Sequence, residues 1–393
     1  MKAIVAGGDG FIGWPLSLAL SHAGHEVLIL DNFARRSLVR QIGSDSLVPL
    51  LPLDERLRVW RSVAPRSVPI QYRELDVASD MPGLLDVVAQ FAPDTLVHLA
   101  TMPSAPYSMK THEAASFTVA NNVQATFHVL WAVAEHAPTA HVVHIGTMGV
   151  YGYDAEDYKL PEGYLQARVA LSDGTTKDIS ILHPMKPGSV YHLTKAQDQL
   201  FFEFFNRQRD LRITDLHQGI VWGANTELTS IDEGLATRFD YDSDFGTVLN
   251  RFAAQAAIGH PLTLYGSGTQ TRAFIHLRDS IECLLLAIGN PPELGDRVRI
   301  FNQFTQMFSV NDVANLVARV GNANIGPIEN PRIEREGNVL SAFNAGLLEL
   351  GLRPTLLAPG LVREILDIAS RHRARINPGV IRPMSFWRRS SAK

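Results

Sequence analysis

A tyrosine and a lysine four residues apart could together remove a proton from a substrate. Tyr191 and Lys195 would share one face of a helix at that spacing. A nearby ammonium favours the phenolate, so Lys195 would lower the pKa of Tyr191 and let the phenol act as a base near neutral pH. Thr147 follows a strand pattern at 141–145, where its hydroxyl could hydrogen-bond the same substrate oxygen. A Tyr/Lys pair alone is also common on an amphipathic helix surface, so Thr147 strengthens the prediction of a catalytic group.

A glycine-rich segment near the start of the chain predicts a dinucleotide site. Gly7, Gly10 and Gly13 follow one strand pattern and open a helical pattern, so the backbone could approach a pyrophosphate at a helix N-terminus. The same glycines could form a plain strand-turn-helix corner, but Asp31 ends the next strand pattern where a carboxylate would hold the adenine ribose hydroxyls. Asp31 favours NAD, because a carboxylate repels the 2′-phosphate of NADP, although two nearby arginines leave NADP open.

Strand and helix patterns alternate through the first half of the chain. Strand patterns occur at 3–6, 26–30, 71–75, 95–99 and 141–145 with helical patterns between them, which indicates an α/β fold with a doubly wound parallel sheet. Two long helices are predicted at 109–135 and 190–208. The segment between them is rich in polar residues, Gly and Pro, and predicts a loop with a hairpin near 172–175.

The second half of the chain predicts a smaller lobe over the sheet. Beyond about residue 215 the regular alternation ends. Strand patterns occur at 262–265 and 298–301, and helical patterns at 309–320 and 359–371.

Composition and charge exclude several classes of function. A chain of 393 residues, 46% apolar and 19% charged, can bury a large core. The net charge of −4 and the pI near 6.4 give no basic surface for nucleic acid or an anionic membrane. The single cysteine, Cys283, fits a reducing compartment, and the histidines lack metal-ligand spacing. We therefore expect a cytoplasmic protein without a targeting or membrane-spanning segment.

The motifs resemble those of the extended short-chain dehydrogenase/reductases, and within them the UDP-sulfoquinovose synthases most closely. The likeness runs almost end to end. In the first half it is carried by Gly7-Gly8-Asp9-Gly10, Asp31-Asn32, Ser104-Ala105-Pro106-Tyr107-Ser108-Met109, Asn121-Asn122-Val123, Gly146-Thr147-Met148-Gly149 and the run from Tyr191 to Lys195. In the second half it is carried by residues 240–242, 245–247, 249–251, 266–272 and 301–305.

This resemblance implies a fold, a cofactor and partners. The fold would be a Rossmann-type NAD-binding domain over 1–215 and a smaller nucleotide-sugar-binding domain mainly over 216–393, with a segment near 274–303 returning to the first domain. The cofactor would be tightly held NAD, and the substrate a nucleotide sugar of the UDP type. The two long helices resemble the pair that forms a four-helix bundle between subunits in this family, which implies a homodimer.

The expected site residues form three groups. The catalytic group is Thr147, Tyr191 and Lys195. The cofactor group is Gly7, Gly10, Phe11, Ile12, Gly13, Asp31, Asn32, Arg36, Asp76, Val77, Leu99, Ala100, Asn122, Tyr191 and Lys195. The substrate group is Ser104, Tyr107, Thr147, His217, Gln218, Asn250, Arg251, Arg272 and Arg332, whose arginines suit a diphosphate because a guanidinium binds it bidentately. No metal ligand is expected.

Departures from the synthase pattern decide the expected reaction. Pro103 and Val150 stand where the synthases carry an arginine and an acid, and sulfite, an anion, needs a fixed cation. His217 is another change near the sugar. Met148 and Gly149 cannot supply the acid–base pair of a 4,6-dehydratase. What remains is removal and return of the C4 hydride, which is the chemistry of an NAD-dependent nucleotide-sugar 4-epimerase. The alternative is a UDP-sulfoquinovose synthase, and a remote one is a non-catalytic dinucleotide sensor.

Overall fold

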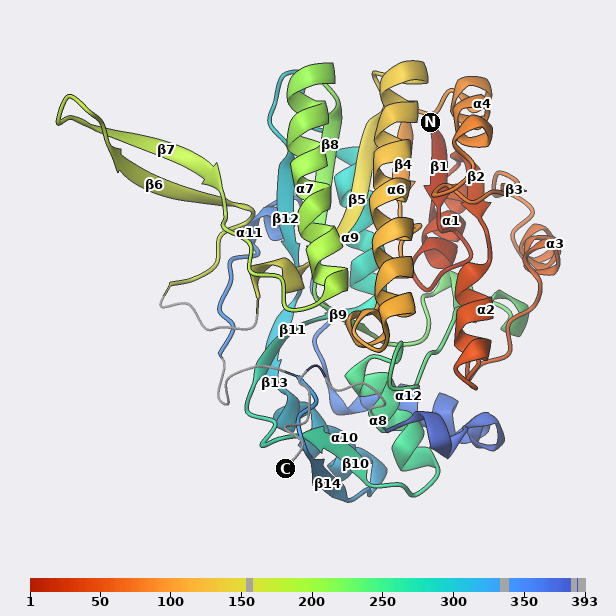
Figure 1. Ribbon diagram of the computed structural model, residues 1–393. Helices are drawn as coiled ribbons and strands as arrows, with labels where there is room; N and C mark the ends of the chain where they lie inside the picture. The colour runs from red at the N-terminus through yellow and green to blue at the C-terminus, as the bar shows by residue number, and fades with distance from the viewer. Residues whose placement is uncertain (153–157, 333–338, 383–386, 388–393) are drawn as a thin grey trace.

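The chain forms a larger sheet lobe above a smaller lobe (Figure 1). The structure, a computed structural model, describes residues 1–152, 158–332, 339–382 and 387. In the described residues a seven-stranded sheet is at the centre of the larger lobe, and the C-terminal third of the chain builds most of the smaller one.

All seven strands of the central sheet run parallel. They are β1 (Lys2–Ala6), β2 (Glu26–Asp31), β3 (Gln71–Glu74), β4 (Thr95–His98), β5 (His141–Thr147), β8 (Arg212–Gln218) and β12 (Arg299–Gln303), in the order β12-β8-β5-β4-β1-β2-β3. The predicted doubly wound parallel sheet is therefore confirmed. The order reverses between β1 and β4, and ligands of such sheets bind beyond the carboxyl ends of the strands at that point.

Helices cover both faces of this sheet, so its strands are apolar on both sides. In β1, Ala3 and Val5 face one core, with α1 (Gly13–His22), α3 (Leu53–Val63) and α9 (Leu277–Gly289). Ile4 and Ala6 face the opposite core, with α4 (Met81–Phe91), α6 (His112–His136) and α7 (Val190–Arg209). Short helices α2 (Ala34–Gln41), α5 (Ala105–Ser108) and α11 (Ala345–Glu349) lie in the connections.

The two long helices begin where side chains can cap them. Thr111 accepts a hydrogen bond from the Ala114 N–H, so α6 begins at His112 and not at the predicted residue 109. Ser189 accepts one from the His192 N–H and fixes the start of α7, which confirms the helix predicted at 190–208. The two helices pack side by side on one face of the sheet (Figure 1).

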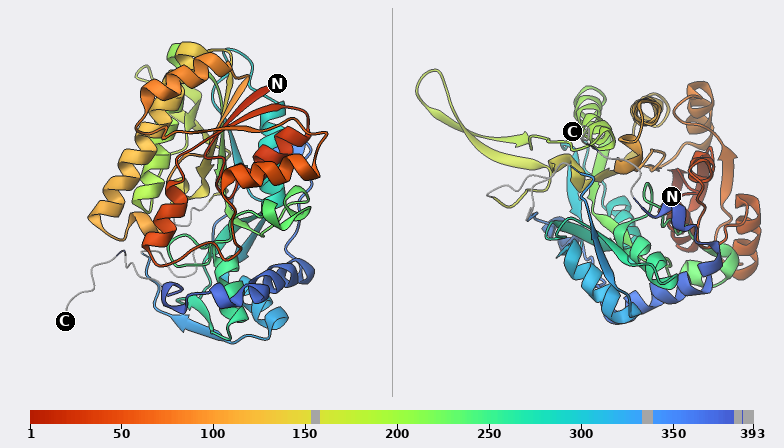
Figure 2. Two further views of the ribbon diagram at one scale, coloured as in Figure 1. Left: turned by 90° about the vertical axis from the view of Figure 1, so that its right-hand side faces the viewer. Right: turned by 60° about the horizontal axis from the view of Figure 1, so that its bottom comes forward.

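The segment that connects α6 to α7 along the chain forms a two-stranded arm that projects from the body (Figures 1 and 2). It is the predicted hairpin, formed by β6 (Tyr164–Ala170) and β7 (Thr176–Leu182). Its register places Leu165 opposite Ile181 and Ala167 opposite Ile179 on one face. On the other face Gln166 donates to Ser180, and Arg168 forms a two-point ion pair with Asp178. The arm thus has one apolar and one polar face.

The smaller lobe packs helices on two short sheets. Its helices α8 (Val248–Ala257), α10 (Val310–Gly321) and α12 (Pro359–Arg371) contact one another. Its sheets are β13-β11-β9 (Gln306–Ser309, Thr271–His276, Ile220–Trp222) and β10-β14 (Leu262–Tyr265, Ile325–Ile328). Short 3-10 turns occur at Met148–Tyr151, Leu228–Ser230, Glu233–Leu235, Arg373–Arg375 and Pro378–Val380.

The expected division has one boundary at residue 215 and a return to the first domain near 274–303, and the chain also crosses between the lobes elsewhere. That boundary falls inside β8, which runs to Gln218, and α9 with β12 belongs to the sheet lobe. An early segment goes the other way, because Leu47 is fully buried in the core of the smaller lobe and its N–H donates to the Phe239 carbonyl. Across the described parts of the chain, no helix combines the length and the apolar character that crossing a bilayer requires.

Gly7 combines a left-handed backbone with a close approach to another strand. Its φ of +88° lies in the region that favours glycine, and a Cβ there would come within 2.7 Å of the Leu99 carbonyl carbon at the end of β4. Gly24 has almost the same φ, +87°, but a Cβ there would have no atom within 4 Å.

These two glycines form a matched pair for a stability test. Gly24→Ala should cost roughly 1 kcal/mol, because it adds only left-handed backbone strain. Gly7→Ala should cost roughly 2–4 kcal/mol, because it adds overpacking against backbone as well. Urea unfolding of both variants measures the difference, and equal midpoints would contradict the close approach of Gly7 to β4.

Candidate active site

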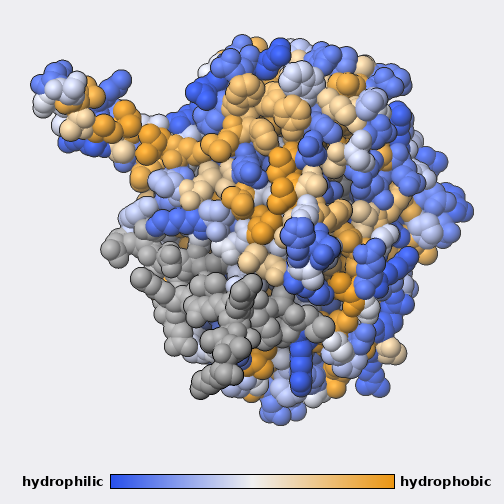
Figure 3. All heavy atoms as spheres, viewed as in Figure 1, coloured by the Kyte–Doolittle hydropathy of each residue, from blue (hydrophilic) through white to orange (hydrophobic). Residues whose placement is uncertain are grey.

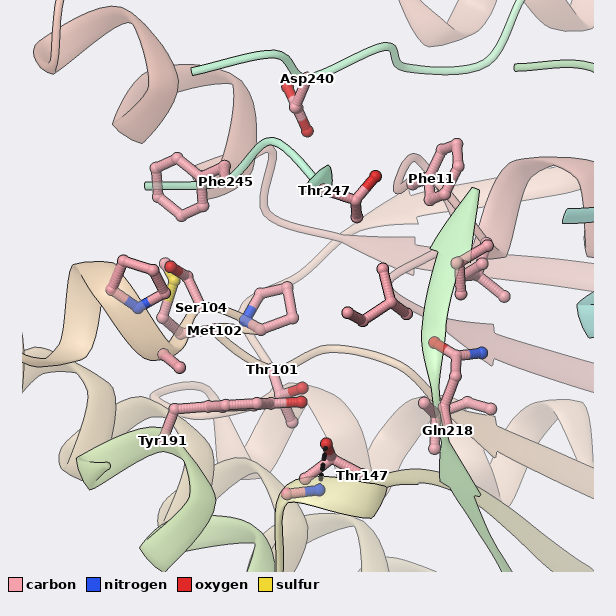
Figure 4. Close-up of a pocket in the computed structure, with 18 of the residues that line it drawn as sticks. Phe11, Thr101, Met102, Ser104, Thr147, Tyr191, Gln218, Asp240, Phe245 and Thr247 are labelled. Carbon is pink, nitrogen blue, oxygen red and sulfur yellow. Dashed lines mark hydrogen bonds between the residues drawn. The ribbon is translucent and has the colours of Figure 1, made fainter. Parts of the chain in front are cut away.

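A cavity of about 460 Å³ lies at the carboxyl ends of the central strands and extends between the lobes. Loops after β1, β2, β4 and β5 form one side, and residues 240–251 and 263–273 of the smaller lobe form the other. Figure 4 shows Tyr191 and Thr147 on one side of the cavity and Asp240, Phe245 and Thr247 on the opposite side.

The cofactor end has the shape that a dinucleotide requires. Gly7 makes the tight turn after β1, and Gly13 packs α1 against that turn, since its Cβ would come within 2.2 Å of the Gly7 carbonyl oxygen. Gly10 lines the cavity, and a Cβ there would have only the Gly7 oxygen nearby, at 3.1 Å. Its absence leaves room for a ligand to approach the backbone. These are the three roles that glycines have in a pyrophosphate-binding turn. The residues therefore fit NAD.

Asp31 closes this end of the cavity. Its two carboxylate oxygens accept hydrogen bonds from the backbone N–H groups of Asp9, at 2.9 Å, and Phe33, at 2.8 Å. Burial, and then the nearby charge of Asp9, raise the pKa of Asp31 to about 6. The carboxylate is thus held by the backbone at the end of β2, where it can accept hydrogen bonds from ribose hydroxyls.

Thr147 and Tyr191 meet at the other end. Thr147 is the last residue of β5, and its Oγ1 accepts a hydrogen bond from the Gly149 N–H at 3.1 Å. Tyr191 is in the first turn of α7, and its N–H donates to Ser108 Oγ at 3.0 Å. In Figure 4 the two hydroxyls point toward one another. Both can therefore contact one substrate oxygen.

Lys195 lies behind the wall and not on it. Its side chain is 1% exposed, and Nζ lies 2.8 Å from Nε2 of His144 and 3.6 Å from a carboxylate oxygen of Asp198. Burial lowers the pKa of Lys195, and the carboxylates of Asp198 and Asp215 oppose that change. Lys195 does not line the cavity, because the buried acceptor His144 engages its ammonium. Its expected role toward the ribose stays a prediction.

A chain of buried polar groups continues from Lys195. His144 Nδ1 donates to Asp215 at 2.7 Å, and the other Asp215 oxygen accepts from His217 Nε2 at 3.0 Å. His217 Nδ1 is 2.9 Å from the Tyr151 hydroxyl. Burial opposes ionisation of Asp215, but His217 and His144 together outweigh it and hold the pKa of that carboxyl below its ordinary value.

The prediction that His217 binds substrate needs correction. His217 is fully buried in this chain of polar groups and does not line the cavity. The next residue, Gln218, does line it, because successive side chains of a strand point to opposite faces. Gln218 is held by Ser280 at 2.8 Å and Gln303 at 2.9 Å.

Four other predicted residues also lie off the wall. Asn122 hydrogen-bonds the backbone N–H and carbonyl of Met102, and so holds a loop of the wall in place. Tyr107 stacks on Phe245, with ring centroids 5.3 Å apart. Asn250 is buried in α8, whereas its neighbour Arg251 lines the cavity. The fourth is Arg36, whose guanidinium pairs with the carboxylate of Asp9.

The remaining predicted residues share the wall of this cavity. They are Gly7, Gly10, Phe11, Ile12, Gly13, Asp31, Asn32, Asp76, Val77, Leu99, Ala100, Ser104, Thr147, Tyr191, Gln218, Arg251, Arg272 and Arg332. Residues so far apart in sequence meet because strand ends and loops of both lobes converge here. In the described residues, no three His, Cys, Asp or Glu side chains are grouped as a metal site would require.

His192 lines the wall of the cavity although it is not among the site residues expected from the sequence. It lines the cavity beside Tyr191, and its ring is so close to Gly149 that a Cβ there would come within 2.3 Å of it. Burial, and then the positive charges of Arg332 and Arg272, lower the pKa of His192 to about 3. Its position next to the tyrosine in the first turn of the helix was the available signal.

Two of the three departures from the synthase pattern, Pro103 and Val150, differ in location. Pro103 lines the cavity, so the loss of a cation there changes the wall. Val150 is fully buried in an apolar cluster with Tyr151, Leu160 and Phe304 and does not line the cavity. Only Pro103 therefore alters the surface that a substrate would contact.

Comparison with known proteins places these features in a wider group. The model of the NAD dependent epimerase/dehydratase family matches residues 3–302. The chain is 39% identical to the chloroplastic UDP-sulfoquinovose synthase of Spinacia oleracea, covering 100% of this chain and 80% of that protein. It is 40% identical to the UDP-sulfoquinovose synthase of Sulfolobus acidocaldarius, covering 99% and 98%.

Solved structures share the fold at lower identity. The UDP-glucuronic acid 4-epimerase of Bacillus cereus, in complex with UDP-glucuronic acid and NAD, superposes with a TM-score of 0.69 at 20% identity, covering 94% of this chain and 99% of that one. The UDP-glucose 4-epimerase of Thermus thermophilus, in complex with NAD, gives 0.64 at 21% identity, covering 94% and 99%.

The buried polar groups behind Lys195 depend on the carboxylate of Asp215, so its loss should strongly lower the free energy of unfolding. Asp215→Asn should destabilise the protein by roughly 3–5 kcal/mol at pH 7, because it leaves buried donors and a cation without their carboxylate. The folded-state pKa of Asp215 is depressed, so its stabilisation exists above the unfolded value of about 3.9 and is lost as pH falls through the folded value.

Urea unfolding between pH 7 and pH 3 measures this effect. The gap between the unmodified protein and Asp215→Asn should narrow below about pH 4. Asp178→Asn, which breaks the exposed ion pair with Arg168, should produce no measurable change. An Asp215→Asn protein as stable as the control would contradict the role of this carboxylate.

Proposed function

The chain belongs to the NAD dependent epimerase/dehydratase family, and on that premise we propose that it is a nucleotide-sugar 4-epimerase. The substrate would be a UDP-type sugar, as in the complexes of the structural neighbours, and NAD would be the cofactor. The observation that carries this proposal is that Tyr191 and Thr147 converge on one point of a cavity whose opposite end fits a dinucleotide.

The proposed chemistry assigns one task to each side chain. NAD, bound by the glycine turn and Asp31, would supply a hydride acceptor and donor at C4. Tyr191 takes the proton of the C4 hydroxyl and later returns it. Thr147 hydrogen-bonds the same oxygen and stabilises the charge that develops on it. Turning of the resulting 4-keto sugar in the cavity would present its other face to the cofactor and so invert C4, with Tyr191 and Thr147 holding the C4 oxygen. Lys195 acts indirectly: it is a buried positive charge on the same helix as Tyr191, and it favours the phenolate form of that tyrosine.

The acid–base groups of the wall favour epimerisation over reactions at C5. The carboxylates of the described wall are all engaged, by arginines for Asp9 and Asp240, by Lys110 for Asp244, and by backbone N–H groups for Asp31 and Asp76. His192 remains, but a pKa of about 3 makes it a weak base. Tyr191 is then the group suited to move a proton, and epimerisation requires only that one.

A second candidate is a UDP-sulfoquinovose synthase, the activity named for the two relatives at 39% and 40% identity. One observation in the cavity favours it. The arginines that lower the pKa of His192 are Arg332 and Arg272, which are also the expected diphosphate ligands. A bound diphosphate would neutralise them, raise the pKa of His192, and so provide a base for enolisation at C5.

Solvent isotope distinguishes the two reactions. An epimerase returns the hydride internally and does not touch C5, so its product formed in deuterium oxide should carry no carbon-bound deuterium. Sulfite addition requires enolisation at C5 and should leave deuterium on carbon and a sulfonate on the product. Mass spectrometry of a panel of UDP-sugars, with and without sulfite, measures both. Any sulfonated product would replace the first candidate with the second.

Two substitutions serve as controls for this assay. Tyr191→Phe should lower turnover at least a hundredfold in either reaction, because proton transfer by a positioned side chain contributes roughly 10²–10⁴-fold. A Tyr191→Phe protein with unchanged turnover would refute both candidates. His192→Gln should leave an epimerase within about tenfold of normal and should abolish a synthase, because only the synthase needs a base at C5.

The proposed assembly is a homodimer formed through the exposed face of α6 and α7. Phe117, Trp131 and Leu193 contribute to this face, and Leu200 and Phe204 are 65% and 51% exposed. Figure 3 shows hydrophobic atoms gathered over α7. A self-complementary patch of this kind suits a two-fold interface.

Light scattering tests the dimer. The unmodified protein at micromolar concentration should have twice the chain mass of 43.3 kDa, and Leu200→Glu combined with Phe204→Glu should reduce it to the monomer mass. Leu356→Glu is the control, because Leu356 is 55% exposed and its neighbour Thr355 is hydrogen-bonded to Asp279 of α9, on the opposite face of the sheet from α6 and α7. This change should leave the mass unaltered. A monomeric unmodified protein would refute the proposal.

A further inference from the structure

Asp9, inside the glycine turn, joins two arginines at the ribose end of the cavity. Its Oδ2 is 2.6 Å from Nε of Arg36, and its Oδ1 is 2.7 Å from Nη2 of the same guanidinium. Oδ1 is also 2.9 Å from Nη1 of Arg56. We call these three residues the Asp9 cluster. All of its charged groups are buried or nearly so, with side-chain exposures of 14% for Arg36, 4% for Asp9 and 0% for Arg56.

Other contacts hold both arginines in this arrangement. Arg36 Nη2 also donates to the Leu51 carbonyl at 2.9 Å. Arg56 Nη2 donates to the Ala236 carbonyl at 3.0 Å, and its guanidinium lies 4.0 Å from the Trp14 ring centroid. A two-point guanidinium–carboxylate pair fixes geometry as well as charge. Neither arginine lines the cavity.

The Asp9 cluster lies next to Asp31, where the adenine ribose would bear a 2′-hydroxyl in NAD and a 2′-phosphate in NADP. The Asp9 N–H donates to Asp31, the carboxylate that would hold the ribose hydroxyls, and the charge of Arg36 acts on the pKa of Asp31. Enzymes that accept NADP use an arginine near this position to receive the 2′-phosphate. Arg36 is in the helix that follows Asp31, but its Nε and Nη2 are already bound to the Asp9 carboxylate.

The other arginine beside the glycine turn is engaged in the same way. Arg35 Nη2 is 2.7 Å from Asp240, and its guanidinium lies 3.6 Å from the Phe245 ring centroid. Arg35 lines the cavity, but its charge is balanced by the buried carboxylate beneath it.

We propose that Asp9 is a specificity-determining residue, which excludes NADP by occupying Arg36 and Arg56. Asp31 supplies the repulsion that a carboxylate exerts on a 2′-phosphate. Asp9 offsets one of the two guanidinium charges and occupies N–H groups of both arginines, which weakens the attraction they would otherwise exert on that phosphate. The proposal rests on NAD as the cofactor of this cavity, and it is independent of which reaction of the sugar follows.

Cofactor binding tests the proposal without any sugar substrate. Protein freed of bound nucleotide is titrated calorimetrically with NAD and NADP, and the ratio of the two dissociation constants is compared among variants. Asp9→Asn should raise the affinity for NADP at least tenfold relative to NAD, because the partly exposed Arg36 is then released to reach the phosphate and the buried charge of Arg56 is no longer offset. Asp9→Asn combined with Arg36→Ala should lose most of that gain. Asp178→Asn removes an equal charge from the distant arm and should leave the ratio unchanged.

Two results would overturn the proposal. One is a folded Asp9→Asn protein, with a cooperative melting transition, whose ratio is unchanged or whose gain survives Arg36→Ala. The other does not depend on Asp9→Asn folding. Arg36→Ala in the unmodified protein should alter NADP affinity less than threefold, because a guanidinium bound to Asp9 does not contact the phosphate. A tenfold loss would mean that Arg36 already binds the phosphate. If no UDP-sugar is turned over but the variants show the expected NAD and NADP affinities, the proposed sugar reaction is refuted and the role of Asp9 is not.

Discussion

The close approach of two strand ends, β1 and β4, is the constraint on which the site depends. These strands are neighbours in the sheet although β2 and β3 lie between them in sequence, and their connections leave in opposite directions. A gap opens there beyond the carboxyl ends. Gly7 lets the β1 turn cross beside the backbone of Leu99, which brings the glycine turn and Asp31 toward the loop that carries Ser104. A side chain at residue 7 would separate these walls.

Buried ion pairs position the working side chains from behind the wall. Charges are costly to bury unless they are paired, so each carboxylate fixes the groups around it. Asp215 of β8 joins His144 of β5 and, through it, Lys195 of α7, which ties the helix that bears Tyr191 to the strand that ends in Thr147. Asp9 similarly joins the glycine turn to α2 and α3. The residues of the cavity wall are those that a ligand would contact, and these buried ion pairs fix their positions.

Much of the fold followed from local sequence patterns, because strand and helix periodicity and the glycine turn are local properties. Patterns at 3–6, 26–30 and 141–145 became central strands, and Asp31 lies where its place after β2 implied. The residues that sequence reasoning misplaced depend on partners far away in the chain. Lys195 lies behind the wall because His144 accepts its hydrogen bond, and His217 because a strand carries alternate residues to opposite faces. The passage of Leu47 into the smaller lobe is set by Phe239, which no local pattern reveals.

The projecting arm has a consequence for the unfolding of the molecule. Its strands pair only with each other among the described strands, and both the Arg168–Asp178 pair and the apolar residues Val169 and Ile181 are exposed. An isolated two-stranded ribbon is at best marginally stable in water. At its base Tyr164 and Leu182 pack against a core of the sheet lobe, so that end is tied to the body. Beyond the base the ladder can open while both cores remain intact, and the amide hydrogens there should exchange with solvent through a local opening whose free energy is far below that of global unfolding.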